Sequence, residues 1–376
     1  MRFLHLSDLH IGRRLNGFSL LEDQKHMLEQ LLSMSKECDA VLLAGDLYDK
    51  AQPSSEAIRT LSDFLVSLSR MNKPVFAVSG NHDTAEQVAY CRELLGECGV
   101  HMAPPFEGTL TCHTLQDEHG PVCVWLLPFI RPASVRPFFP EVRTYEDALR
   151  SALSTANFRS DARHVLVAHQ YVSGAEICDS ETRLIGGVDQ VSLSVFDPFD
   201  YVALGHLHSP QRLSGGRVCY CGSPLPYSLS EETQRKAALM VELGEKGSLT
   251  VVAKPISPLR KVRTVTGTLP EISDPALFSE DYVYAILTDE TLQLDPLGAL
   301  RITYPHLLGM RIQNSRTVET AAVMEETDAE AFTPMEHFVQ FYRAQNNDQM
   351  PDERRLAVIR RIIEEAEGKS HATDLA

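Results

Sequence analysis

Five short clusters of aspartate, histidine and asparagine recur along the first 210 residues, each at or just after the end of an apolar run. The clusters are Asp8-Leu9-His10, Gly45-Asp46-Leu47-Tyr48-Asp49, Gly80-Asn81-His82-Asp83, Ala168-His169 and Gly205-His206-Leu207-His208. Carboxylate, imidazole and amide groups without thiolate suit Mn²⁺ or Fe²⁺, allow Zn²⁺ or Mg²⁺, and disfavour a structural zinc site. The clusters therefore predict a metal centre built from segments far apart in the sequence.

Seven of these side chains are the predicted metal ligands, a number that is too large for one ion and suits two. The seven are Asp8, His10, Asp46, Asn81, His169, His206 and His208. A pair of ions needs a shared carboxylate, and Asp46 is the natural bridge because it lies centrally in the set. Two metals held close together activate a water and stabilise a phosphoryl transition state. The combination predicts hydrolysis of a phosphate ester, although each cluster alone would be an ordinary turn or surface feature.

Apolar, β-branched runs predict the strands that must position these clusters. The runs lie at residues 3–6, 40–44, 75–78, 122–127, 164–168 and 201–204, and helical patterns lie at 20–32, 58–68 and 86–95. Strand ends on one edge of a sheet bring their side chains together, and the alternation of strands with helices predicts an α/β layered fold. Further runs, which indicate antiparallel closure of a second sheet, lie at 218–221, 237–241 and 249–252. His5, inside the first run, is predicted to be a packed core histidine.

Changes in composition divide the chain into three predicted parts. Residues 1–256 form the metal-binding domain, 257–318 a small α/β domain, and 319–376 a helical, polar segment. Within the small domain the pattern has segments at 261–265, 282–287, 301–304 and 310–313. In the last part, Thr333-Pro334-Met335-Glu336 predicts a helix start, because proline is favoured at the first helical position. Gly368 is the predicted end of a second helix.

Overall charge and cysteine use limit the classes of function. The 376 residues carry a formal net charge of −16, which disfavours strong autonomous DNA binding unless metals or a partner supply cations. The eight cysteines are scattered without a C-x-x-C pair, so we expect no zinc or disulfide framework and a reducing, cytoplasmic location. The sequence shows neither a long apolar run nor a signal peptide, so no membrane association is expected.

The order of the motifs, D-x-H, G-D-x-x-D, G-N-H-D, H and G-H-x-H, resembles the calcineurin-like metallophosphoesterase superfamily. Within it, residues 3–12, 45–49, 78–83 and 201–208 look like the SbcD family of bacterial nuclease subunits. Residues 281–289 and 301–305 resemble the small capping domain of that family, and the similarity weakens towards the C-terminus. The resemblance implies a four-layer sandwich of two mixed sheets flanked by helices, with an α/β capping domain and a helical tail.

The resemblance also implies a role for each motif residue. Asp8, His10, Asp46 and His208 would hold one metal, and Asp46, Asn81, His169 and His206 the other. His82 would face the scissile phosphate and stabilise the transition state or protonate the leaving oxygen. Asp49 would orient His82 as a hydrogen-bonding carboxylate. Asp83 is interpreted as a turn residue that fixes its loop.

The implied activity is that of a Mn²⁺-dependent DNA nuclease subunit in DNA repair and recombination. It would be an ATP-dependent 3′-to-5′ double-strand exonuclease and a single-strand and hairpin endonuclease, acting with an SbcC-type ATPase on double-strand ends and hairpins. ATP would be used by the partner, because this chain has no G-x-x-x-x-G-K-[ST] loop. Basic residues in or near the loops beside the motifs are predicted either to contact DNA phosphates or to be solvated surface charges; they are Arg13, Arg14, Lys50, Arg131 and Arg183. The predicted contacts to the ATPase are the apolar tail residues Phe338, Phe341, Leu356, Ile359 and Ile362, which otherwise pack on their own domain.

The family further implies a homodimer within a heterotetramer, formed by the helices near 58–68 and 86–95. The apolar stripe of Val88, Cys91 and Leu95 fits such an interface and fits a buried core face equally well. Two alternative functions are compatible with the same sequence features. A small-molecule phosphodiesterase would share the metal centre but does not need the long C-terminal parts. A non-catalytic scaffold that tethers DNA ends would be expected to have lost ligands, and all seven are kept.

Overall fold

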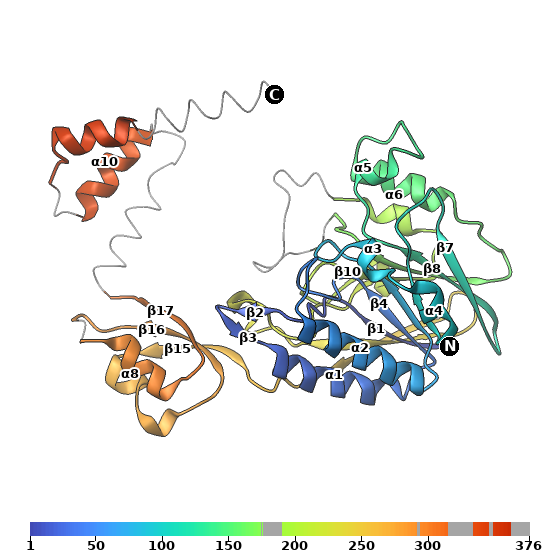
Figure 1. The fold of residues 1–376 in the computed structure, drawn as a ribbon, viewed down its shortest axis with the longest axis horizontal. Helices are drawn as coiled ribbons and strands as arrows, with labels where there is room; N and C mark the ends of the chain where they lie inside the picture. Colours follow the sequence, from blue (N-terminus) through green and yellow to red (C-terminus); the bar gives the residue numbers. More distant parts are fainter. Residues whose placement is uncertain (174, 176–189, 292–293, 315–333, 346–348, 362–376) are drawn as a thin grey trace. The chain divides into compact units, whose positions relative to one another are not determined.

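The computed structural model describes residues 1–173, 175, 190–291, 294–314, 334–345 and 349–361 (Figure 1). The chain divides into two compact units that are interleaved in sequence. The first contains residues 1–264, 278–284 and 304–309, and the second contains residues 265–277, 285–303 and 310–376. The predicted boundaries at 256 and 318 stay predictions.

The first sheet has six strands in the order β14-β13-β1-β4-β5-β6. Its strands are β1 (Arg2–Leu6), β4 (Ala40–Ala44), β5 (Val75–Val78), β6 (Val100–Met102), β13 (Ala237–Leu243) and β14 (Leu249–Pro255). Strands β1, β4, β5 and β6 run parallel, whereas β13 pairs antiparallel with β1 and with β14. The first strand of the chain therefore lies between β4 and the much later β13.

The second sheet also has six strands, in the order β11-β12-β10-β9-β8-β7. Its strands are β7 (Thr111–Asp117), β8 (Gly120–Leu127), β9 (Arg163–His169), β10 (Tyr201–Gly205), β11 (Gln211–Leu213) and β12 (Val218–Tyr220). The four inner strands are parallel, and the edge strands β7 and β11 are antiparallel to their neighbours. Both sheets are thus mixed, as the family resemblance implies.

Two apolar sheet faces meet in the middle of the first unit. Phe3, Leu42 and Phe76 from the first sheet pack in one buried cluster with Val124 and Val167 from the second. The outer faces are covered by helices: α1 (Leu21–Ser35) and α2 (Ser55–Arg70) lie side by side on the first sheet, and α6 (Tyr145–Ser154) packs on the second (Figure 1). This helix–sheet–sheet–helix order confirms the predicted four-layer sandwich.

The remaining elements of the first unit are short. They are the hairpin β2 (Arg14–Leu15) and β3 (Phe18–Ser19), the helices α3 (Ala85–Val88), α4 (Arg92–Glu97) and α5 (Pro132–Val135), and the 3₁₀ turns η1 (Leu193–Phe196), η2 (Ser214–Gly216) and η3 (Leu229–Glu231). Side-chain caps start the longer helices α2 and α6: the Ser54 hydroxyl accepts from Ala57 N at 3.2 Å, and Thr144 accepts from Asp147 N at 3.1 Å.

Two details of the predicted fold are wrong. The runs at 237–241 and 249–252 do not close the second sheet, because β13 and β14 join the first sheet beside β1. The helix expected at 86–95 is broken in two, since Cys91 has a left-handed backbone with φ of 56° that a continuous helix cannot contain. The edge strand β7 escaped prediction because its sequence, TCHTLQD, is mostly polar and half-exposed.

Three further strands form a separate sheet in the order β15-β16-β17. They are β15 (Val262–Gly267), β16 (Tyr282–Leu287) and β17 (Leu307–Ile312), accompanied by α7 (Leu269–Ile272), η4 (Pro275–Leu277) and α8 (Pro296–Thr303). Thr268 caps α7 by a reciprocal hydrogen-bonded box with Glu271. The segment predicted at 301–304 is the end of helix α8.

Two helices are described near the C-terminus. Helix α10 (Pro334–Gln345) begins at the proline that the sequence predicts, and a second helix covers residues 353–361. They touch where Arg355 lies over the ring of Tyr342, with 5.7 Å between the guanidinium carbon and the ring centre. Phe341 is 57% exposed, and Phe338, Leu356 and Ile359 are half-buried. Ile362 and Gly368 lie outside the described residues. None of the helices in the described ranges has the length and apolar content needed to cross a bilayer.

A hydrogen-bonded histidine joins the two sheets through the core. His5 Nδ1 lies 2.8 Å from the hydroxyl oxygen of Tyr201, and His5 Nε2 lies 3.2 Å from the carbonyl oxygen of Leu204. The ring is fully buried, as predicted for a core histidine. Burial lowers the pKa of His5 from 6.5 to about 3, so the native protein holds this ring neutral.

We expect His5→Gln to make the free energy of unfolding less dependent on pH in mild acid. Between pH 6.5 and about 3 the unfolded chain binds a proton at His5 that the native chain does not, so wild-type stability falls as pH falls through this window. The contribution is at most about 1.4 kcal/mol per pH unit. Urea unfolding at several pH values measures it, and parallel wild-type and variant curves would contradict the assignment.

Candidate metal centre

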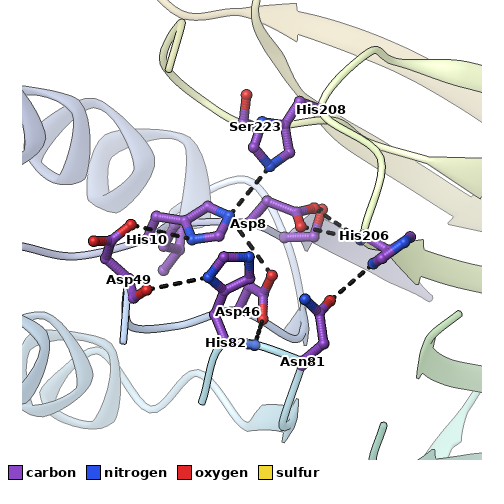
Figure 2. A network of polar contacts seen from close by, with 12 residues as sticks. Asp8, His10, Asp46, Asp49, Asn81, His82, His206, His208 and Ser223 are labelled. Atoms are coloured by element: carbon purple, nitrogen blue, oxygen red, sulfur yellow. Dashed lines mark hydrogen bonds and ion pairs between the residues drawn. The ribbon is translucent and has the colours of Figure 1, made fainter. Parts of the chain in front are cut away.

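The predicted ligands come together where strands of the two sheets end (Figure 2). Asp8 and His10 follow β1, Asp46 follows β4, and Asn81 follows β5 of the first sheet. The second sheet contributes three histidines, which are His169 at the end of β9 and His206 and His208 after β10. All seven predicted side chains therefore face one site, built by segments from residue 8 to residue 208.

Asp46 lies between two groups of ligands. Its Oδ2 is 3.6 Å from His10 Nε2 on one side and 3.4 Å from His169 Nε2 on the other. His10 Nε2 is in turn 3.2 Å from His208 Nε2, with Asp8 in the same group (Figure 2). This central position is the one that a carboxylate shared by two ions requires.

The second group gathers around an amide oxygen. Asn81 Oδ1 lies 3.0 Å from His169 Nε2 and 2.8 Å from His206 Nδ1. His169 Nδ1 lies 2.8 Å from the carbonyl oxygen of Ala44, which fixes the ring from behind. The main-chain N–H of His206 donates to Asp8 Oδ1 at 3.0 Å, and this hydrogen bond links the loop after β10 to the loop after β1.

Several residues at the site have unusual backbone conformations, and two glycines there are packed too closely to carry a side chain. The predicted ligands Asp8, His10, Asp46 and His206 have positive φ angles of 52°, 44°, 49° and 103°. A Cβ on Gly80 would lie 2.0 Å from Asp46 Oδ1, and one on Gly205 would lie 1.9 Å from the carbonyl oxygen of Ala44. Strain of this kind concentrates at functional sites, where the surrounding fold must maintain it.

The protonation of two of the predicted ligand histidines suits metal binding, whereas His169 would release a proton on binding a metal. Burial lowers the pKa of His10 well below its usual value and that of His206 to about 3, so both rings are neutral and offer lone pairs at neutral pH. Burial also opposes the charged form of His169, but the charge of Asp46 outweighs it and raises the pKa of His169 to about 9. His10 Nδ1 is buried without a hydrogen-bond partner among the residues that the structure describes. These converging lone pairs and carboxylates fit divalent ions.

The two predicted catalytic residues lie beside this centre. His82 Nδ1 is 3.2 Å from the carbonyl oxygen of Asp49, and the His82 main-chain N–H donates to Asp46 Oδ1 at 2.9 Å. We predicted that the carboxylate of Asp49 orients His82. The structure corrects this prediction, because the main-chain carbonyl of Asp49 makes the contact. The carboxylate instead accepts from Arg13 at 2.9 Å and lies 3.9 Å from His10 Nδ1.

Asp83 does more than fix its own turn. Its Oδ1 accepts from Gly80 N at 2.6 Å, and its Oδ2 accepts from Leu47 N at 2.7 Å and from Tyr48 N at 3.4 Å. The side chain is buried, which raises its pKa to about 7. Asp83 thus joins the loops that carry Asp46 and Asn81, a role that no local sequence signal reveals.

A second group missed by the sequence lies behind His208. Glu231, at the end of η3, is fully buried with its Oε1 3.4 Å from His208 Nδ1. Burial opposes ionisation of Glu231, but His208 and Lys236 outweigh it and hold the pKa of this carboxyl below its usual range. Ser223 donates to Glu231 Oε2 at 3.1 Å, and both His208 and Ser223 are seen in Figure 2. His208 and Glu231 are 23 residues apart in the sequence, so no short sequence motif contains both of them.

The predicted DNA contacts lie around the site to different degrees. Arg13 is half-buried, bonded to Asp49 and placed over the ring of Tyr227. Arg14, Lys50 and Arg131 are exposed, and Arg131 lies over the ring of Phe129. Arg183 lies outside the described residues. The contacts with DNA stay predictions.

We expect Gly80→Ala to inactivate the site without unfolding the protein. The added methyl group would overlap Asp46 Oδ1 and displace the central carboxylate, and a shift near 1 Å at a reacting centre costs roughly a hundredfold in rate. Hydrolysis of bis(p-nitrophenyl) phosphate with Mn²⁺ measures the loss. Gly96→Ala is the matched control, because the nearest atom to its new Cβ is 4.0 Å away. Equal activity of the two variants would contradict the expected displacement.

The sandwich and its carboxylate–histidine cluster define a metal-dependent phosphoesterase. The chain belongs to the calcineurin-like phosphoesterase family, whose profile matches residues 1–210. Residues 258–346 match a second family, described as the type 5 capsule protein repressor C-terminal domain.

A curated relative supports the same class. A subunit of the nuclease SbcCD from Staphylococcus epidermidis is 32% identical over 323 residues, which covers 82% of this chain and 85% of that protein. Solved structures are more distant. An archaeal phosphodiesterase matches 67% of this chain and 99% of its own with 11% identity and a TM-score of 0.31. The protein TT1561 of Thermus thermophilus matches 67% of this chain and 98% of its own with 15% identity and a TM-score of 0.33.

Proposed function

We propose that this chain is the nuclease component of a complex that cleaves DNA, acting with an SbcC-type ATPase on double-strand ends and hairpins in the cytoplasm. The observation that carries the proposal is the gathering of all seven predicted ligands at one site, with Asp46 at the centre and His82 held beside it. The 32% identity to a protein named as part of the SbcCD nuclease supports DNA as the substrate.

The residues would divide the chemistry among them. Asp8, His10 and His208 would hold one divalent ion, Asn81, His169 and His206 the other, and Asp46 both. Two such ions, for which Mn²⁺ suits this ligand set, would lower the pKa of a nucleophilic water and neutralise phosphate charge.

His82 would act on the phosphate and the leaving group. Its Nδ1–H donates to the Asp49 carbonyl, so the doubly protonated ring would present Nε2–H to the phosphate and pass that proton to the leaving 3′ oxygen. The carbonyl of Asp49 orients the ring, while the carboxylate of Asp49 anchors Arg13 near the site. Arg13 would then be placed to meet a phosphate of the bound strand.

Cleavage of an end-labelled DNA hairpin, with and without Mn²⁺, the ATPase and ATP, tests the proposal. We expect Mn²⁺-dependent cleavage that the ATPase and ATP enhance, with products that show the 3′-to-5′ polarity implied by the family. Failure to cleave any DNA, together with hydrolysis of a small phosphodiester, would assign the centre to a small-molecule phosphodiesterase. Failure on both substrates would favour a tethering scaffold.

The ATPase partner would dock on the C-terminal helices. Helix α10 and the helix at 353–361 pack on each other through Tyr342 and Arg355 and still leave Phe341 exposed. An apolar side chain of this size on a short helical pair favours burial against another protein. The acidic net charge of −16 is consistent with a partner that supplies much of the DNA-binding surface.

We also propose that the chain forms a homodimer through α2, α3 and α4, as half of a heterotetramer. These helices border an apolar hollow of about 500 Å³, and Tyr90 and Leu94 beside it are 77% and 68% exposed. An apolar hollow flanked by exposed apolar side chains is typical of an interaction surface, and tyrosine is enriched at the cores of subunit contacts.

We expect Leu94→Glu to convert the dimer to a monomer, because a buried unpaired carboxylate opposes association. Sedimentation velocity measures the mass directly. Leu294→Glu is the matched control, since Leu294 is 99% exposed and lies away from these helices in sequence. A wild-type protein that sediments as a monomer at micromolar concentration would contradict the proposed dimer.

A further inference from the structure

The ring of His208 is held between two different environments. Its Nε2 lies 3.2 Å from His10 Nε2 inside the ligand cluster (Figure 2), while its Nδ1 lies 3.4 Å from Glu231 Oε1. A neutral imidazole carries one hydrogen, and only the nitrogen without it can bind a metal. The partner at Nδ1 therefore decides whether Nε2 is a ligand.

Glu231 is itself fixed by a buried network. Its Oε2 accepts from Lys236 Nζ and from Ser223 Oγ, and its Oε1 accepts from Tyr227 N at 3.3 Å and Ser228 Oγ at 3.1 Å. Lys236 also donates to the carbonyl oxygen of His208 at 3.0 Å. Glu231 is fully buried and Lys236 nearly so. The network holds the carboxylate and the histidine backbone in one arrangement.

We propose that Glu231 is a positioning residue that keeps the hydrogen of His208 on Nδ1 and so presents the Nε2 lone pair to the metal held with Asp8 and His10. A carboxylate accepts hydrogen bonds and cannot donate one, so it admits a single tautomer of the ring. The inference rests on the proposed metal centre and adds the group that makes His208 a competent ligand. Acceptors behind ligating histidines commonly have this effect.

The other metal position obtains the same orientation differently. His169 Nδ1 faces the carbonyl oxygen of Ala44 at 2.8 Å, and no substitution removes a main-chain carbonyl. His208 instead depends on a side chain 23 positions away in sequence. Changing Glu231 should therefore affect one of the two metal positions and spare the other.

The test compares two double variants that both remove the buried ion pair. Removing Glu231 alone would leave the buried Lys236 ammonium without its carboxylate, which is strongly destabilising, whereas removing both charges is tolerated. In Glu231→Gln with Lys236→Met, the amide oxygen can still accept from His208 Nδ1 while the amide nitrogen donates to Ser223. In Glu231→Leu with Lys236→Met, the acceptor is gone. The two variants differ in that acceptor, which also serves Tyr227 N and Ser228 Oγ, and in the contact of residue 231 with Ser223.

Calorimetric titration with Mn²⁺ and the electron paramagnetic resonance signal of the coupled Mn²⁺ pair provide the readouts. We expect the glutamine variant to bind two ions nearly as wild type does. We expect the leucine variant to lose on the order of 10- to 100-fold in affinity for one ion and to keep the other. Equal binding by both variants, or equal loss in both, would overturn the proposal. Wild-type protein that binds fewer than two ions would instead contradict the proposed metal centre.

A measurement on the wild-type protein covers the case in which the double variants do not fold. Selective ¹⁵N labelling of histidine in the full-length, metal-free chain reports which ring nitrogen carries hydrogen, and His208→Gln assigns the signal. We expect His208 to be protonated on Nδ1 at neutral pH. Protonation on Nε2 would overturn the proposal whatever the variants do.

Discussion

Replacing Asp46 with asparagine is expected to lower Mn²⁺-dependent hydrolysis of bis(p-nitrophenyl) phosphate by roughly a thousandfold. Metal stabilisation of a phosphoryl transition state contributes several kcal/mol, and each 1.36 kcal/mol is about tenfold in rate. Asp46 Oδ2 lies within 3.6 Å of His10 Nε2 and 3.4 Å of His169 Nε2, so an amide nitrogen there would point hydrogens at both ligand groups.

The asparagine variant should keep its fold, because its remaining oxygen can still accept from the His82 main-chain N–H. Thermal unfolding in EDTA checks this, and metal analysis should show fewer than two ions per chain. Asp63→Asn is the control, since Asp63 is an exposed carboxylate on α2. Wild-type activity in Asp46→Asn would remove Asp46 from the metal centre and with it the proposed bridge.

Replacing His82 with alanine is expected to lower kcat by about 10²- to 10⁴-fold while both metals stay bound, which is the range typical of a general acid or base. The contact from His82 to Asp46 comes from the main chain, so alanine preserves it. Single-turnover cleavage of a DNA hairpin alongside metal analysis separates chemistry from metal binding. His119→Ala, at an exposed histidine, is the matched control.

Asp49→Ala refines the same experiment. Because the carbonyl of Asp49 rather than its carboxylate contacts His82, this variant should lose far less activity than His82→Ala. A loss as large as that of His82→Ala would restore the carboxylate as the orienting group. Metal loss in His82→Ala would assign His82 to the ligand set instead, as its placement near His10 and Asp46 allows.

Much of the site could be predicted because its information is local. Asp8, Asp46 and Asn81 each follow a short apolar strand, and parallel strands place such positions at one edge without any knowledge of distant contacts. The central, fully buried strands were visible for the same reason, since their residues are apolar on both faces. The histidine in the core was visible because His5 interrupts such a run.

The features that escaped prediction depend on tertiary context. Edge strand β7 is partly exposed along its length and its sequence is mostly polar. It therefore lacks the apolar pattern by which a strand is predicted. Strand β13 (Ala237–Leu243) pairs with β1 (Arg2–Leu6), although the two are far apart in the sequence. The residue pattern of neither strand identifies the other as its partner. Asp83 and Glu231 look like ordinary acidic residues in turns, and only the packed structure shows which N–H groups and which ring they serve.

The position of β1 has a consequence for how the chain is made. β1 is translated well before one of its two neighbours in the sheet, β13, which is made only when residues 237–243 are reached. Until then the nascent chain carries an open apolar strand edge, which is a hazard for aggregation and a natural site for chaperone binding. The last ligands, His206 and His208, also arrive late. A chain that ends before residue 206 contains Asp8 and Asp46 but neither His206 nor His208, so the predicted metal centre can be completed only after β10 has been synthesised.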